Sequence, residues 1–186
     1  MQLYHFPSPN PQKVTFALKE LGLDCEIVEV DLGKGEHRQP AFLAHNPFGR
    51  LPVLVDGGLT LPESHAILVY LGETAGRLWP ASAAGRADGL RWLFFLSQHI
   101  MPPAGDVALR FRAKLFGRPV DEVTVQRGEQ ALPEALKNVP AVSAMKPTPQ
   151  PLAVQLPFIT IVPWKARKPA LLHFAAAQPL TVICEP

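Results

Sequence analysis

The chain has 186 residues, a mass of 20.3 kDa and 47% apolar residues, which suffices for one ordinary domain or two small ones and excludes disorder throughout. Its 18 basic and 16 acidic side chains leave a net charge of +2, too little for a broad field that would bind nucleic acid or an anionic membrane. No apolar run reaches the roughly 18 residues of a membrane span, and the N-terminal residues lack the order of a signal peptide.

The first 30 residues alternate between strand and helix signals. Residues 2–5 are typical of a short buried strand. A helix follows, for which Asn10 is the predicted N-cap and Pro11 the first helical residue, and Gly22 is its predicted end. Residues 25–30 alternate like a half-buried strand. This β-α-β order predicts two parallel strands joined by a right-handed crossover.

A hairpin and a second helix come next. Residues 51–55 and 59–61 flank Asp56-Gly57-Gly58, a turn sequence typical of a β-hairpin. Apolar residues then recur at helical spacing from Ser64 to Gly76. The strands together predict a mixed four-stranded sheet with helices.

The following part of the chain is predicted to be helical. Small residues at 80–85 are typical of a linker. Residues 86–101 and 105–116 favour one long helix, or two helices broken around Pro102-Pro103, and residues 119–136 are a further helical candidate. These helices leave apolar faces uncovered, so we expect an incomplete all-α domain.

The composition changes near residue 137. Residues 1–136 hold all 13 glycines, with 15 acidic and 13 basic residues. The last 50 residues have no glycine, nine prolines, one acidic residue and five basic residues, which gives them a charge of +4. Frequent proline leaves no window for a stable helix. One interpretation is a disordered tail in which residues 158–162 form a single apolar segment, and another is a shifted reading frame.

The cysteine content predicts neither a disulfide scaffold nor a metal site. Cys25 and Cys184 are too far apart in sequence for a CxxC redox pair or a zinc knuckle. With the small net charge and the lack of a membrane span or signal peptide noted for this sequence, we expect a cytoplasmic protein without a metal, a membrane association or a nucleic-acid partner.

Three motifs together indicate a family. They are K-G-E-H at 34–37, N-P-F-G-R-L-P-V-L at 46–54, and E-S at 63–64 before a helix. With the order of elements, they resemble the glutathione S-transferase family, most closely its bacterial nu-class and yeast prion-related branch, over residues 1 to about 136. The resemblance implies an α/β fold with a thioredoxin-like glutathione-binding domain. The expected units are residues 1–79, a linker at 80–85, a partial all-α domain at 86–136 and an atypical tail at 137–186.

The resemblance implies where glutathione binds. In the family the proline of the second motif is cis and the residue before it lends backbone groups to the cysteinyl part, which implicates Pro52 and Leu51 here. Glu63 and Ser64 match the residues that hold the γ-glutamyl end, although Ser64 also suits a plain helix N-cap. His37 and Arg50 match positions that contact the glycine end in some classes, with a solvated surface role as the alternative.

The catalytic position is expected just after the first strand. A hydroxyl or amide that donates a hydrogen bond to sulfur stabilises the thiolate of glutathione. Ser8 and Asn10 are the candidates, with a turn residue and a helix N-cap as their alternative roles. The family's pocket for the second substrate, an electrophile, would take residues from the helical domain. Its candidates, for which core packing is the alternative, are Phe94, Phe95, His99, Met101, Phe111 and Phe116.

The implied function is that of a glutathione transferase active in detoxification. Glutathione would be a co-substrate, no cofactor is expected, and the second substrate would be a small electrophile or a disulfide. A homodimer is implied by the family, and Phe48 occupies the place where some classes insert an aromatic side chain into the partner. The alternative is a non-catalytic glutathione-fold module or an inactive truncated transferase.

Overall fold

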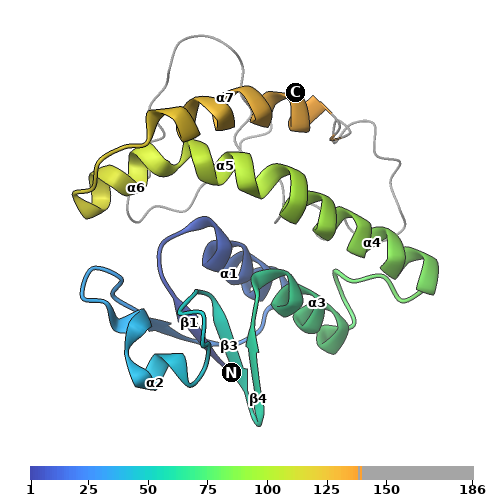
Figure 1. The fold of residues 1–186 in the computed structure, drawn as a ribbon. Coiled ribbons are helices and arrows are strands. Elements are labelled where there is room, and N and C mark those ends of the chain that lie inside the picture. The colour runs from blue at the N-terminus through green and yellow to red at the C-terminus, as the bar shows by residue number, and fades with distance from the viewer. Residues whose placement is uncertain (138, 140–186) are drawn as a thin grey trace, which may run out of the picture.

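The computed structural model describes residues 1–137 and residue 139. A four-stranded sheet with its helices forms one unit, and the helices after residue 82 form a second layer above it (Figure 1). The predictions for the tail, apart from Lys137 and Val139, lie outside the described residues.

The sheet is mixed, as the sequence predicts. Its strands, in the order β2-β1-β3-β4, are β2 (Glu26–Glu29), β1 (Gln2–His5), β3 (Val53–Asp56) and β4 (Leu59–Pro62). β1 runs parallel to β2, and β3 is antiparallel to both β1 and β4. The turn between β3 and β4 is formed by Gly57 and Gly58, so the predicted hairpin is confirmed.

Helices cover both faces of the sheet. α1 (Pro9–Leu21) and α3 (Ser64–Ala75) lie between the sheet and the second layer, whereas α2 (Pro40–Leu43) lies on the other side (Figure 1). The core beneath α1 and α3 consists of Leu3, Val14, Leu18, Leu21, Leu54, Ile67 and Leu71. Under α2, a smaller cluster consists of Val30, Phe42 and Val53.

α1 begins earlier than predicted. Ser8 is the N-cap, with extended backbone at φ −145° and ψ 161°, and Pro9 is the first helical residue. The prediction of Asn10 as N-cap and Pro11 as first helical residue is therefore wrong. The physical reason is that the first N–H groups of a helix have no intrahelical acceptor, so Pro9 and Pro11 both fit within the first turn and the helix can begin at Pro9.

The second layer is a run of helices. They are α4 (Ala83–Phe95), the π-helical turn η2 (Leu96–Ile100), α5 (Met101–Val107), α6 (Leu109–Phe116) and α7 (Glu122–Lys137). α4 begins within the segment predicted to be a linker, because the Ser82 hydroxyl accepts a hydrogen bond from the Gly85 amide at 3.1 Å and caps the helix.

Of the two alternatives for residues 86–116, a helix broken around Pro102-Pro103 is wrong. The helical path continues through η2, and the discontinuity falls at Ala108 between α5 and α6. Proline has no N–H, so the carbonyls one turn before Pro102 and Pro103 lack their α-helical donors. A wider π turn directly before the two prolines accommodates this loss without ending the helix.

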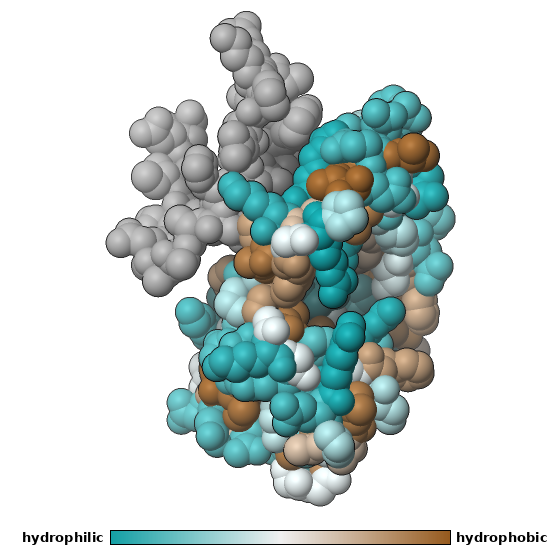
Figure 2. All heavy atoms as spheres, turned by 60° about the vertical axis from the view of Figure 1, so that its left-hand side comes forward, coloured by the Kyte–Doolittle hydropathy of each residue, from teal (hydrophilic) through white to brown (hydrophobic). Residues whose placement is uncertain are grey.

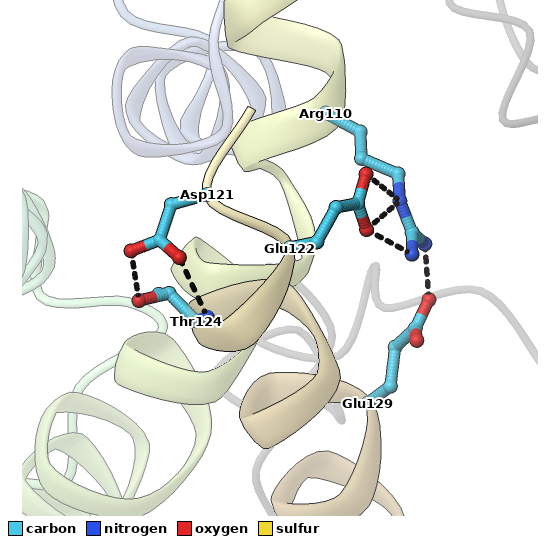
Figure 3. A network of polar contacts seen from close by, with 5 residues as sticks. All are labelled: Arg110, Asp121, Glu122, Thr124 and Glu129. Atoms are coloured by element: carbon cyan, nitrogen blue, oxygen red, sulfur yellow. Dashed lines mark hydrogen bonds and ion pairs between the residues drawn. The ribbon is translucent and has the colours of Figure 1, made fainter. Parts of the chain in front are cut away.

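Polar contacts join α6 to α7 (Figure 3). Arg110 on α6 pairs with Glu122 at 2.7 Å and also with Glu129, both on α7. Asp121 caps α7 by accepting hydrogen bonds from the amide and the hydroxyl of Thr124. These contacts are exposed to solvent, which screens them, so we expect them to contribute little to the stability of the layer.

The helical layer keeps large apolar side chains at its surface, as expected for an incomplete domain. Phe94 is 63% exposed and Val123 79%, and Leu90, Phe111, Leu115 and Val120 are also exposed. On the face drawn in Figure 2, apolar residues lie scattered among hydrophilic ones in both layers. In the part of the chain that the structure describes, no helix is long and apolar enough to span a membrane.

Candidate functional site

A polar pocket forms where the start of α1, the loop before β3 and the start of α3 meet. It is lined by Asn10, Asn46, Arg50, Leu51, Pro52, Glu63 and Ser64. Six of the eight predicted site residues are thus brought together, although they come from three separate segments. Ser8 and His37 do not line this pocket.

Asn46 shapes the loop that delivers Arg50 and Leu51 to the pocket. Its side chain is 2% exposed, and its amide donates to the Arg50 carbonyl at 2.8 Å while its oxygen accepts from the Phe48 N–H at 3.1 Å. Gly49 has φ +60°, and a Cβ there would lie 2.9 Å from the carbonyl oxygen of His37. The loop therefore requires glycine for both its backbone conformation and its space.

The peptide bond between Leu51 and Pro52 is cis, as predicted. Pro52 is buried and Leu51 half-buried. Pairing of β3 with its neighbours begins at Val53, so the backbone groups of Leu51 are outside the sheet ladder. They lie at the pocket wall, where a peptide ligand can pair with them.

The start of α3 forms the opposite wall. Glu63 is the N-cap residue, with φ 72° and ψ 108° and no side-chain capping bond, and Ser64 is the first helical residue. The alternative of Ser64 as a plain N-cap is therefore wrong. Ser64 is buried while the Glu63 side chain is exposed. The first N–H groups of a helix lack intrahelical acceptors and carry partial positive charge, so this wall suits a carboxylate.

Of the two catalytic candidates, the structure brings only Asn10 into the pocket. Asn10 is the second residue of α1, and its amide can donate to a ligand atom. Its alternative role as N-cap is taken by Ser8, whose hydroxyl makes no capping bond although its carbonyl accepts from the Gln12 N–H at 3.1 Å. Ser8 is next to the pocket in sequence but does not line it.

The two residues expected at the glycine end differ in position. Arg50 lines the pocket with an exposed side chain. His37 lies on the 3₁₀ turn Glu36–Arg38, outside the pocket lining. Within the described residues its Nδ1 is buried without a hydrogen-bond partner, and burial, with a smaller contribution from Arg38, lowers the pKa of His37.

The residues proposed for an electrophile site do not reach this pocket. Phe94 and Phe111 are exposed, and the rings of Phe95 and His99 lie 5.2 Å apart on the helical layer. Tyr4 packs edge-on against Phe42 and lies outside the pocket lining.

The pocket suits a zwitterionic peptide more than a metal ion. It offers the Glu63 carboxylate, the Arg50 guanidinium, the Asn10 amide and the N-terminus of α3. In the described part of the chain no group of three His, Cys, Asp or Glu side chains could hold a metal. Asn46 is the lining residue that sequence reasoning missed, although it opens the 46–54 motif.

Comparisons with known proteins agree with this geometry. Residues 1–73 match the model of the glutathione S-transferase N-terminal domain. Glutathione S-transferase 3 of Zea mays is 39% identical over 142 residues, which cover 73% of this chain and 64% of the relative. The disulfide-bond oxidoreductase YfcG of Escherichia coli is 40% identical over 112 residues, covering 56% and 52% of the two chains.

Solved structures have the same fold. Glutathione transferase F7 of Populus trichocarpa matches with a TM-score of 0.67 and 34% identity, covering 73% of this chain and 67% of that one. Ure2p in complex with glutathione matches with a TM-score of 0.65 and 30% identity, covering 73% and 61%. The chain spans about a third to two thirds of the length of the curated relatives it matches. On this fold, these motifs and these relatives, the chain belongs to the glutathione S-transferase family.

Proposed function

We propose that the pocket binds glutathione and that the protein uses the glutathione thiol for conjugation to a small electrophile. The observation that carries the proposal is the meeting of three elements in one pocket: the backbone beside the cis bond at Leu51, the start of α3 at Ser64, and the amide of Asn10. The glutathione bound to the related Ure2p supports it.

We expect the tripeptide to bind with its γ-glutamyl end at α3 and its glycine end at Arg50. Its γ-glutamyl carboxylate would lie at the N-terminus of α3, with Glu63 close to its ammonium group. The cysteinyl backbone would pair with Leu51, and the glycine carboxylate would face Arg50. His37 belongs to the loop beside Gly49 and is a secondary candidate at this end.

Asn10 is the proposed catalytic residue. A free thiol has a pKa near 8.5, so a donor that prefers the thiolate raises the reactive fraction at neutral pH. The Asn10 amide would donate to sulfur and the thiol proton would pass to solvent. The thiolate would then attack the electrophilic carbon to form a C–S bond, and the leaving group, chloride in the case of chlorodinitrobenzene, would depart with its bonding electron pair. Ser8 remains the second candidate for this hydrogen bond.

Disulfide exchange is a second candidate activity, favoured by the 40% identity to an oxidoreductase of that name. One glutathione thiolate would attack the substrate disulfide and release one thiol. A second glutathione would attack the mixed disulfide, releasing the second thiol and oxidised glutathione. Cys25 does not line the pocket, so both electrons would come from the two glutathione molecules.

The remaining expectations stay predictions. Phe48 is 83% exposed at the tip of its loop, which supports its proposed insertion into a second copy. A homodimer, a cytoplasmic location and a role in detoxification belong to the same proposal. The exposed apolar residues of the helical layer support the alternative of a non-catalytic glutathione-fold module.

The proposal is tested by titration calorimetry and turnover on the full chain. Glutathione should bind, and turnover with chlorodinitrobenzene or a hydroxyethyl disulfide should distinguish the two activities. Asn10→Ala should reduce turnover about a hundredfold with little change in affinity, as expected for a group that acts on the reacting sulfur. The matched control is Gln12→Ala on the same helix. Binding without turnover would support the non-catalytic module, and no binding would overturn the proposal.

A further inference from the structure

A part-buried series of hydrogen-bonded side chains joins three helical segments beside the pocket. Lys13 on α1 is 8% exposed, and its Nζ lies 2.8 Å from Nε2 of His65 on α3. The other ring nitrogen of His65, Nδ1, lies 2.8 Å from Oγ of Ser97 on the π turn η2. These hydrogen bonds therefore connect the sheet unit to the helical layer.

The direction of these hydrogen bonds follows from their chemistry. An ammonium group only donates, so Nε2 of His65 accepts from Lys13. The ring proton then sits on Nδ1 and is donated to Ser97. Burial, with a smaller contribution from the charge of Lys13, lowers the pKa of His65 to about 4, so the ring is neutral and able to accept at pH 7.

Two of these side chains are close in sequence to residues that line the pocket. Lys13 is one turn after Asn10, and His65 follows Ser64. The ammonium of Lys13 is close enough to Glu63 for that carboxylate to raise its pKa, although burial is the larger effect and lowers the pKa of Lys13 to about 8. Burying a lysine costs free energy. The hydrogen bond to His65 and the nearby carboxylate of Glu63 are the interactions that offset the burial of the Lys13 ammonium.

We propose that Lys13 is a positioning residue of the glutathione pocket: through His65 and Ser97 it holds the start of α3 against the helical layer, and it supplies a buried positive charge at the γ-glutamyl end. This inference rests on the proposed function. It makes the helical layer part of the binding site through the single hydroxyl of Ser97.

The inference predicts a pH dependence of affinity. The groups that act on Lys13 are Glu63, a negative charge at the start of α3, and His65, which is neutral above pH 5; Ser97 is uncharged. A ligand carboxylate is favoured while Lys13 is protonated. Its contribution is present below pH 8 and is lost as the pH rises through about 8.

The test compares Lys13→Met with Lys13→Arg on the full chain, with Lys19→Met on the same helix as the matched control. S-methylglutathione is the probe, because it has no thiol to titrate, and its own amino group affects all variants equally. At pH 7, Lys13→Met should weaken binding about tenfold, Lys13→Arg by less than threefold, and Lys19→Met not at all. The effect of Lys13→Met should shrink to about twofold at pH 9.5.

A second variant tests the route through the helical layer. Ser97→Ala should weaken binding of S-methylglutathione about threefold at pH 7. If Lys13→Met does not unfold cooperatively and so is not folded, the inference is decided by Ser97→Ala and Lys13→Arg instead. The inference would be overturned if the wild type, Lys13→Met and Ser97→Ala bound with equal affinity. It would also be overturned if the ratio of the wild-type and Lys13→Met affinities did not change with pH. In both cases the proposed function stands. If the wild type binds no S-methylglutathione and no glutathione, the proposed function fails and the inference fails with it.

Discussion

Gly89 on α4 faces the indole of Trp79 so closely that a Cβ at residue 89 would lie 3.0 Å from Cη2 of the ring. On the other side, a Cβ at Gly72 on α3 would lie 2.8 Å from Cβ of Trp79. Trp79, which is 8% exposed, therefore packs between α3 of the sheet unit and α4 of the helical layer. Two glycines allow the two helices to approach it.

Gly89→Ala should destabilise the protein. Alanine is the better helix former by roughly 0.5–1 kcal/mol, but the added methyl must displace the indole, which costs about 1–3 kcal/mol. The net loss should appear in urea unfolding. Gly105→Ala is the matched control, because a Cβ at residue 105 comes no closer than 3.9 Å to its nearest neighbour, Arg112. A Gly89→Ala protein as stable as Gly105→Ala would show that Trp79 does not fix the spacing of α3 and α4.

The strands and the pocket backbone were predictable because their signals are local. The hairpin glycines, the glycines that end α1 and α3 at Gly22 and Gly76, and the motif around Pro52 each act within a few residues. The start of α1 could not be placed from the sequence because Pro9 and Pro11 both fit within a first helical turn, where the N–H groups have no intrahelical acceptor.

The contacts behind the pocket were not predictable in the same way. Lys13 and His65 are 52 residues apart, and His65 and Ser97 are 32 apart. Their meeting depends on how α1, α3 and η2 pack, which no short window of sequence contains. Asn46 lies within the 46–54 motif, but its role depends on hydrogen bonds to Phe48 and Arg50 that exist only in the folded loop.

Glu63 should lower the stability of the fold through its backbone conformation while its side chain strengthens glutathione binding. Its φ of 72° is unfavourable for any residue except glycine, at a cost of about 1 kcal/mol. Comparing Glu63→Gly with Glu63→Ala removes the side chain in both cases and isolates the backbone. Glu63→Gly should be more stable by about 1 kcal/mol in urea unfolding, while both variants bind glutathione more weakly than the wild type. Equal stability of the two variants would contradict a strained backbone at this residue.

Asn46→Ala should damage both stability and binding. Its buried amide makes two hydrogen bonds within the loop, and removing it leaves the Phe48 N–H and the Arg50 carbonyl without this partner. We expect a loss of about 1–3 kcal/mol in the free energy of unfolding. Glutathione affinity should fall as well, because the loop positions Leu51. Gln39→Ala, at an exposed side chain, is the control, and an Asn46→Ala protein that binds and unfolds like it would contradict this role.

His65 should make the protein less stable in mild acid. Its folded-state pKa of about 4 lies below the ordinary value of 6.5, so on acidification the unfolded chain takes up the proton first. The free energy of unfolding should therefore fall from about pH 6.5 towards pH 4. Because the ring is partly exposed, we expect about 2 kcal/mol by pH 4.5, less than full burial would give.

The comparison with His65→Gln isolates this effect from the carboxylates that titrate in both proteins. Urea unfolding at pH 7, 5.5 and 4.5 should show the wild type losing about 2 kcal/mol more than His65→Gln over this range. Lys13 does not contribute, because its pKa of about 8 keeps it protonated throughout. If the two proteins lose stability in parallel, His65 does not stay neutral in the folded state, and its ring cannot accept the hydrogen bond from Lys13 at the lower pH values.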